Sequence, residues 1–83
     1  MHPQLILYGT AICHLCELAE AIVAPIAHKH RIQLSLVDIA EQSGLDAYET
    51  RIPVLGLEFR EGLIELDWPF DAAAVTKLVS TKN

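Results

Sequence analysis

The sequence predicts a single α/β domain in which a four-stranded mixed sheet carries helices on both faces. The chain has 83 residues, so residues 1–83 are enough for one domain and too few for two. A short apolar run, a stretch with helical periodicity and an alternating run follow one another, which indicates a parallel strand–helix–strand unit with a right-handed crossover. Two later apolar runs are separated by a short turn, which predicts an antiparallel hairpin. The expected order is βαβ-(α)-ββα.

The first unit begins with residues 4–8, a short apolar run that Gly9 closes and that predicts a buried strand. Over residues 14–28 apolar side chains recur at helical spacing, which predicts an amphipathic helix. Pro25 falls inside this stretch and is expected to kink the helix or to end its first segment. The expected buried face comprises Leu15, Leu18, Ala19, Ile22, Val23 and Ile26.

The middle of the chain continues the sheet. Over residues 32–38, Ile32, Leu34 and Leu36 alternate with Gln33, Ser35 and Val37, which predicts a second strand that ends at Asp38. Residues 41–49 are typical of a short, weak helix. Pro53 precedes a third predicted strand at 54–59, and a turn leads to a fourth at 63–66. The carboxylates of the hairpin are spaced as exposed positions: Glu58, Glu61, Glu65 and Asp67.

The last predicted element is a helix over residues 72–80, for which Asp71 is the expected N-cap. Trp68 and Phe70 precede this helix. They either form an apolar rim for a partner or pack the helix onto the sheet, and packing is the favoured interpretation. The expected buried face of the helix comprises Ala72, Val75, Leu78 and Val79.

Composition and charge exclude several classes of partner. The chain has a net charge of −5 and six scattered Lys and Arg residues, whereas nucleic-acid binding needs a concentrated basic face. No apolar run approaches the roughly 20 residues that span a bilayer, and the N-terminus lacks the features of a signal peptide. We therefore expect a cytoplasmic protein with no nucleic-acid or membrane partner, and its small size favours a monomer.

The two cysteines of the chain stand as Cys13-His14-Leu15-Cys16, between the first predicted strand and the first predicted helix. A structural disulfide is disfavoured in the reducing cytoplasm, so a close pair indicates redox chemistry or metal binding. A helix N-terminus offers free backbone N–H groups and the positive end of the helix dipole. Both favour a thiolate, which is the attacking species in thiol–disulfide exchange.

Other segments extend this C-x-L-C pattern, notably an Ile-Pro dipeptide at the start of the third predicted strand and a Trp-Pro-Phe-Asp segment before the last helix. The segments are Tyr8-Gly9-Thr10, Cys13-His14-Leu15-Cys16, Val37-Asp38-Ile39, Arg51-Ile52-Pro53-Val54-Leu55 and Trp68-Pro69-Phe70-Asp71. Together they resemble the thioredoxin-like fold in its minimal, glutaredoxin-like form. The similarity is greatest to a family of small bacterial glutaredoxin-like proteins, and it spans nearly the whole chain.

The resemblance implies a thiol–disulfide oxidoreductase with no bound cofactor. Cys13 is then the nucleophile that forms a mixed disulfide with a disulfide-containing protein or a glutathione adduct, and Cys16 is the resolving thiol. The resemblance also implies a cis Ile52–Pro53 bond beside the cysteines, although cis is the form of only about 5–6% of X–Pro bonds. The backbone of Ile52 would then bind a peptide or glutathione. The alternative is that Pro53 merely starts a strand.

Several positions depart from the glutaredoxin pattern. His14-Leu15 replaces the usual Pro-Tyr, no Lys precedes Cys13, and no Gly-Gly follows the fourth strand. The last two are usual contacts to glutathione, so its role as co-substrate is left open. Arg51 is either a partner for a substrate carboxylate or a solvated loop charge. His14 either stabilises the neighbouring thiolate and raises the reduction potential, or is a solvated residue of the first turn.

The same cysteines allow two further hypotheses. One is a metal site, but His28 and His30 lie about 18 Å along a helix from the cysteines, too far to complete one Zn²⁺ site. A two-cysteine ligand set shared across a dimer, including an iron–sulfur cluster, is compatible with this distance. The other hypothesis is a redox-inert interaction domain that keeps the fold.

Overall fold

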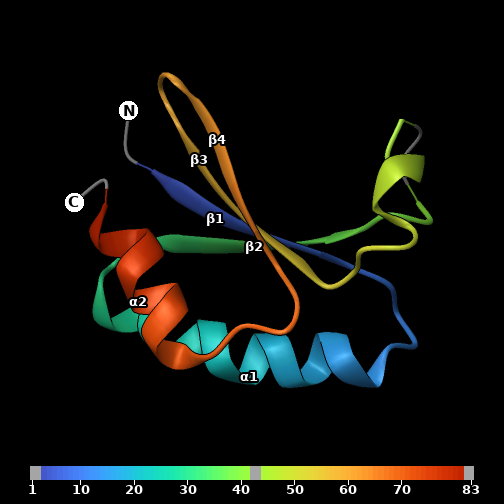
Figure 1. Ribbon diagram of the computed structural model, residues 1–83, viewed down its shortest axis with the longest axis horizontal. Helices are drawn as coiled ribbons and strands as arrows, with labels where there is room; N and C mark the ends of the chain where they lie inside the picture. The colour runs from blue at the N-terminus through green and yellow to red at the C-terminus, as the bar shows by residue number, and fades with distance from the viewer. Residues whose placement is uncertain (1–2, 42–43, 82–83) are drawn as a thin grey trace.

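The structure is a computed structural model that describes residues 3–41 and 44–81 (Figure 1). Its elements are β1 Gln4–Gly9, α1 His14–Lys29, β2 Gln33–Asp38, the 3₁₀ turn η1 Asp46–Tyr48, β3 Val54–Phe59, β4 Gly62–Asp67 and α2 Ala72–Ser80. The predicted α/β class and order of elements are confirmed. Of the weak helix expected over residues 41–49, the described part contains only η1, and residues 42 and 43 lie outside the described residues.

The central strand β1 has a neighbour on each side, and the order in the sheet is β2-β1-β3-β4. β1 and β2 are parallel, with Gly9 opposite Asp38, so both strands end at one edge. β3 is antiparallel to β1 and to β4, with Val54 opposite both Tyr8 and Asp67. The ends of β1, β2 and β4 and the start of β3 therefore meet at the same edge, which we name the β1 C-terminal edge.

The two α-helices pack on one face of the sheet and against each other (Figure 1). Leu5 and Leu7 of β1 point toward them, while Tyr8 points the other way because side chains alternate along a strand. Burial of this aliphatic layer is the main source of stability. Neither helix of the described chain is long and apolar enough to cross a membrane. The buried members of the main core are Leu5, Leu7, Ala19, Val23, Ala27, Ile32, Leu55, Leu57, Phe70, Val75, Leu78 and Val79.

The opposite face carries a second, smaller cluster near the β1 C-terminal edge. Its buried residues are Tyr8, Ile39 and Val54. Tyr48 and Ile52, from the segment that contains η1, are partly buried against them. Helical structure therefore lies on both faces of the sheet, as predicted, but unequally: α1 and α2 share one face, and the short 3₁₀ turn belongs to the other.

Helix α1 continues through Pro25 to Lys29, so the expectation that the proline ends its first segment is wrong. Pro25 is exposed, whereas Val23 and Ala27 on either side of it are buried. The stabilisation from burying Val23 and Ala27 exceeds the cost of the one backbone hydrogen bond that the proline cannot donate.

The buried face of α1 is rotated from the predicted one. Leu15 and Leu18 are 46% and 42% exposed, so their predicted burial against the sheet is wrong. Small side chains at the centre of the contact allow the helix to lie close to the sheet, and the two leucines project at its side. The buried residues of α1 are Cys16, Ala19, Val23 and Ala27.

Helix α2 begins where the sequence predicts. The Oδ1 atom of Asp71 accepts a hydrogen bond of 2.8 Å from the backbone N–H of Ala74, as an N-cap does. The prediction that Ala72 is buried is wrong, because this first helical residue lies on the exposed side. The buried residues of α2 are Val75, Leu78 and Val79.

Replacing Leu55 by alanine is expected to lower the free energy of unfolding by about 2–5 kcal/mol, because it leaves a cavity where a fully buried side chain of β3 packs. The matched control is Leu36→Ala on β2, whose side chain is 57% exposed and whose loss is expected to cost about 1 kcal/mol or less. Urea unfolding followed by circular dichroism measures both. Equal costs would contradict the assignment of the core.

Candidate functional site

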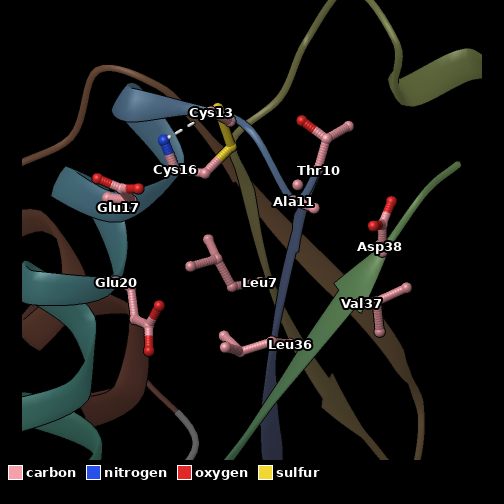
Figure 2. A pocket seen from close by; sticks show the side chains of 11 residues that line it. Leu7, Thr10, Ala11, Cys13, Cys16, Glu17, Glu20, Leu36, Val37 and Asp38 are labelled. Carbon is pink, nitrogen blue, oxygen red and sulfur yellow. Dashed lines mark hydrogen bonds between the residues drawn. A yellow bond between two sulfur atoms is a disulfide. The ribbon is translucent and has the colours of Figure 1, made fainter.

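The cysteine pair lies at the β1 C-terminal edge, where the loop after β1 leads into α1 (Figure 2). Cys13 is the N-cap of α1, and Cys16 lies in the first turn. The two side chains form a disulfide, and their Cα atoms are 5.2 Å apart, inside the usual range of about 4.4–6.8 Å. The backbone thus holds both sulfur atoms within bonding reach, as reversible dithiol–disulfide chemistry requires.

The first turn of α1 directs a hydrogen-bond donor at Cys13. The backbone N–H of Cys16 donates to the Sγ atom of Cys13 over 3.1 Å, and the N–H of Glu17 donates to the Cys13 carbonyl over 3.1 Å. Cys13 has an extended backbone, with φ −153° and ψ 104°, as N-cap residues do. Because a helix N-terminus favours negative charge, this position stabilises a thiolate on Cys13 once the disulfide is reduced.

The two sulfur-bearing residues differ in accessibility. Cys13 is half-buried, whereas Cys16 is buried and only 9% exposed. A disulfide that arrives from solvent therefore reaches Cys13 first. The difference is consistent with the predicted order, in which Cys13 attacks and Cys16 resolves.

Cys16 packs tightly against the end of β1. A Cβ atom added to Gly9 would lie 2.9 Å from the Sγ and 3.2 Å from the Cβ of Cys16, so a larger residue would push the helix and the strand apart. The absence of a Cβ at Gly9 is what allows this close approach. The sequence analysis assigns Gly9 only to the end of a strand, because no local pattern encodes the distance between β1 and α1.

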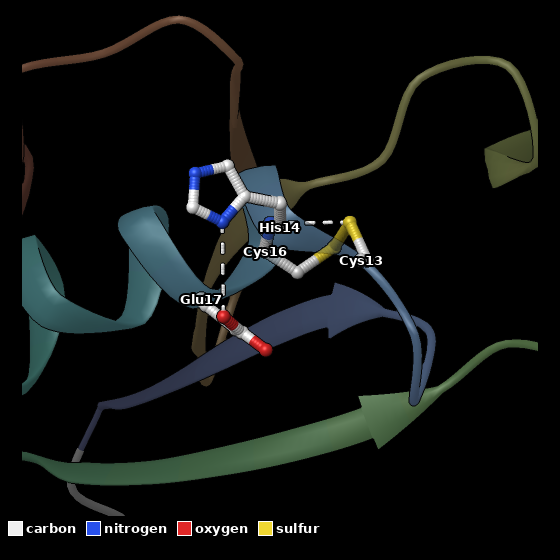
Figure 3. Close-up of a disulfide and its surroundings, with 4 residues drawn as sticks. All are labelled: Cys13, His14, Cys16 and Glu17. Carbon is white, nitrogen blue, oxygen red and sulfur yellow. Dashed lines mark hydrogen bonds and ion pairs between the residues drawn. A yellow bond between two sulfur atoms is a disulfide. The ribbon is translucent and has the colours of Figure 1, made fainter.

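His14 lies beside the cysteine pair as a solvated side chain. It is 80% exposed, and its Nδ1 atom is 3.8 Å from Oε2 of Glu17, which is 74% exposed (Figure 3). The imidazole is directed toward this carboxylate rather than toward a buried partner (Figure 3). Exposed pairs of this kind interact weakly. The proposed effect of His14 on the redox chemistry therefore stays a prediction.

A pocket of about 280 Å³ opens beside the disulfide, between α1 and the ends of β1 and β2 (Figure 2). Leu7 and Leu36 line it from the sheet, and the disulfide lies at one end (Figure 2). Glu17 and Glu20 line it from α1, and Asp38 lines it from the end of β2. The sequence analysis does not assign Leu36 or Asp38 to a site, because only the parallel pairing of β1 and β2 brings them near the cysteines. It places Glu20 on the exposed side of α1, although its spacing of four residues from Cys16 is a signal that could have found it.

The segment before β3 reaches the same edge. The Ile52–Pro53 peptide bond is cis, the form that the family resemblance implies. Pro53 is fully buried, and the pairing of Val54 with Tyr8 places it at the β1 C-terminal edge. The structure thus brings Ile52 and Pro53 to the edge that holds the cysteine pair. Binding of a substrate backbone by Ile52 stays a prediction.

Trp68 and Phe70 follow β4 and pack before α2 begins. The Trp68–Pro69 bond is also cis, which the sequence analysis does not anticipate. Phe70 is buried in the main core and Trp68 is partly buried against it. Their rings meet edge to face, with centroids 5.0 Å apart and planes at 82°. The packing interpretation is therefore confirmed, and a substrate contact of Trp68 stays a prediction.

Arg51 is paired within the chain. Its Nη2 atom lies 2.7 Å from Oδ1 of Asp67 and 3.0 Å from Oε1 of Glu65, and its guanidinium carbon lies 5.3 Å from the ring centroid of Tyr48. This pairing contradicts the alternative of a solvated loop charge. It ties the segment before β3 to the end of β4, and any substrate carboxylate must compete with two resident carboxylates for the guanidinium.

Tyr48 completes this group of residues. Its hydroxyl donates a hydrogen bond of 2.5 Å to Oε2 of Glu65, and its ring stacks on Tyr8 with centroids 4.3 Å apart. The hydrogen bond from Tyr48, reinforced by Arg51, holds the pKa of Glu65 below its usual value of 4.5. The same hydrogen bond, together with burial, raises the pKa of Tyr48 above its usual range.

The expectation that Glu65 is an exposed hairpin carboxylate is therefore wrong. It is half-buried and bonded to two side chains from the segment before β3. The alternating pattern of the hairpin indicates which residues share a face, but it carries no information about the distant segment that covers that face.

The metal hypothesis gains no further ligands. Among residues 3–41 and 44–81, no group of three or more His, Cys, Asp or Glu side chains is arranged to hold a metal ion. His28 is in the last turn of α1 and His30 is its C-cap, at the opposite end of the helix from the cysteine pair.

Comparison with protein families gives a match over nearly the whole chain. The family model of the Glutaredoxin-like domain (DUF836) matches residues 4–80, which is nearly the whole chain. No curated protein is significantly similar in sequence.

Several solved structures with a similar fold are thioredoxins. A mutant thioredoxin from Halobacterium salinarum superposes with a TM-score of 0.80 at 23% identity, over 96% of this chain and 74% of that one. Thioredoxin 1 from Thermosipho africanus has a TM-score of 0.76 at 15% identity, over 94% and 91%. Oxidized thioredoxin O2 from Arabidopsis thaliana has a TM-score of 0.71 at 19% identity, over 95% and 73%. These likenesses show a thioredoxin-like fold.

Replacing Gly9 by alanine is expected to lower the free energy of unfolding by about 1–3 kcal/mol, because the new methyl group overpacks the contact with Cys16. The measurement is urea unfolding in the presence of dithiothreitol, so that no disulfide contributes. In a Cys16→Ala background the same change should cost less, because the Sγ atom 2.9 Å away is gone. An unchanged cost would place the clash elsewhere.

The lowered pKa of Glu65 predicts a pH dependence of stability. Since its folded-state pKa lies below the ordinary 4.5, its stabilising contribution is present above that pH and is lost as the pH falls through the folded-state value. Glu65→Gln should therefore flatten the fall in unfolding free energy between about pH 5 and pH 3. The matched control is Glu61→Gln, an exposed carboxylate of the hairpin turn. Urea unfolding across this range compares the two, and equal slopes would contradict the assignment.

Proposed function

This chain belongs to the Glutaredoxin-like domain (DUF836) family, and on that premise we propose that it is a thiol–disulfide oxidoreductase. Its substrate is the disulfide of a protein or of a glutathione adduct. The observation that carries the proposal is the Cys13–Cys16 disulfide at the N-terminus of α1, with the Cys16 N–H directed at the Cys13 sulfur. The thioredoxin-like fold and the family match support a thiol–disulfide role in general.

In the proposed first step, the reduced protein attacks through Cys13. The thiolate displaces one sulfur of a substrate R–S–S–R′, forms the mixed disulfide Cys13–S–S–R and releases R′–S⁻, which takes a proton from water. The backbone N–H of Cys16 and the N-terminus of α1 stabilise the attacking thiolate. The greater exposure of Cys13 supports its role as the attacking group.

In the second step, Cys16 resolves the mixed disulfide. Its thiol loses a proton and attacks the Sγ atom of Cys13, R–S⁻ leaves and is protonated, and the Cys13–Cys16 disulfide forms. In total, two electrons and two protons pass from the protein dithiol to the substrate disulfide. A second dithiol, or two molecules of glutathione as co-substrate, is the class of reductant that restores the starting pair.

The residues around the pair have supporting roles in this proposal. The backbone of Ile52, next to the cis Pro53, aligns the substrate chain, and Trp68 borders it. Arg51 keeps this loop in place through its ion pairs with β4. His14, when protonated, adds a positive charge beside Cys13 and favours the thiolate.

The proposed setting is a monomer in the cytoplasm with no bound cofactor and no nucleic-acid or membrane partner. A reducing compartment would return the pair to the dithiol form after each turnover. The net charge of −5 supports the absence of a nucleic-acid partner.

A redox titration against glutathione buffers tests the proposal, with the thiol state read by mass after alkylation. We expect a reversible two-electron transition between about −270 and −180 mV. Cys16→Ser should abolish this transition and accumulate a mixed disulfide at Cys13, whereas Cys13→Ser should accumulate none. A wild-type pair that shows no transition, or mixed disulfides that form at residue 16 instead, would overturn the function or the assigned order of attack.

A further inference from the structure

We infer that the preferred substrate is a polypeptide disulfide flanked by Lys or Arg side chains. This inference rests on the proposed function and adds a substrate class to it. It is carried by the distribution of charge and of exposed apolar side chains around the disulfide.

Carboxylates border the approach to the cysteine pair on the pocket side. The charged residues that line the pocket are Glu17, Glu20 and Asp38, and no Lys or Arg lines it. Glu17 and Glu20 are exposed on successive turns of α1, and Asp38 ends β2 across the pocket from them (Figure 2). His14 is the other titratable side chain here, and it faces Glu17.

The Lys and Arg residues of the described chain do not offset this charge. Arg51 reaches the β1 C-terminal edge, but Glu65 and Asp67 both pair with it. The remaining Lys and Arg residues belong to the opposite edge, because α1, α2 and β3 all run away from the cysteines. These are Lys29 at the end of α1, Arg31 just after it, Arg60 in the turn between β3 and β4, and Lys77 in the last turn of α2. The formal side-chain charges that line the pocket beside Cys13 are therefore all negative.

Exposed apolar side chains favour a polypeptide over a small cation. Ile12, directly before Cys13, is 97% exposed, and Leu15 and Leu18 project from α1. Ile12 and Leu15 are next to the cysteines in the sequence, and Leu36, which is 57% exposed, lines the pocket. A chain that extends beyond its cystine gains contact with these side chains, whereas a small disulfide does not reach them.

The step is the one proposed above: the Cys13 thiolate attacks the peptide disulfide, one peptide thiolate leaves and is protonated, and Cys16 then releases the second. A Lys or Arg next to the peptide cystine reduces the repulsion between the leaving thiolate and the carboxylates of the pocket. Oxidised glutathione brings additional carboxylates to the same place and is disfavoured.

The experiment compares three symmetrical peptide disulfides built from Lys-Cys-Lys, Gly-Cys-Gly and Glu-Cys-Glu with blocked ends. The second-order rate of oxidation of the reduced wild-type protein is measured at low salt by quenching and alkylation. Each rate is divided by that of dithiothreitol with the same peptide, which removes intrinsic reactivity. We expect the Lys peptide to exceed the Glu peptide by about tenfold or more, and added salt to shrink this ratio.

A charge variant and a matched control locate the effect. Glu20→Gln removes one pocket carboxylate and should lower the Lys-to-Glu ratio by about twofold, the size expected for one charge in water. Glu61→Gln removes the same charge from the hairpin turn at the opposite edge and should leave the ratio unchanged. Equal effects of the two variants would overturn the role of the pocket.

The outcomes separate this inference from the proposed function. If no peptide oxidises the protein, the proposed function itself fails. If all three react at the same corrected rate, the function stands and the charge selection is overturned. Cystamine, a small dicationic disulfide, serves as the fourth probe. A corrected rate equal to that of the Lys peptide would overturn the preference for a polypeptide, and a lower rate supports it.

Discussion

The site depends on the pairing of β1 with a strand on each side. The parallel partner β2 ends beside it, and the antiparallel partner β3 begins beside it. Three loops that are distant in the sequence therefore meet at one edge, carrying the cysteine pair, Asp38 and the Ile52–Pro53 bond. The buried layer between the sheet and the two α-helices holds β1 in this central position, and no single loop could assemble the site without it.

Close packing at the end of β1 determines how the cysteines are presented. Gly9 leaves room for the side chain of Cys16, so α1 can begin directly beside the strand. Cys16 is thereby buried, while Cys13 stays at the N-cap, accessible and bonded to a backbone N–H. The difference in exposure between the two sulfur atoms follows from this packing, since the C-x-x-C spacing alone does not distinguish them.

Polar contacts hold the segment before β3 against the end of β4. Arg51 and Tyr48, from the segment before β3, both bond to Glu65 of β4, and Arg51 also bonds to Asp67. These contacts neutralise Arg51, so that none of the Lys and Arg residues of the described chain offsets the pocket carboxylates at this edge. The same group of residues therefore supports the loop and shapes the charge that a substrate meets.

The sequence by itself determined the α/β class, the four strands, the two α-helices, the Asp71 cap and the placement of Cys13 and Cys16 at a helix start. These features follow from local periodicity, capping and motif spacing. Only the tertiary structure decided which side of α1 is buried, that α1 continues through Pro25, that Gly9 touches Cys16 and that Arg51 and Tyr48 share Glu65. Each of these depends on the distance and angle between elements far apart in the sequence, and local patterns carry no such distances.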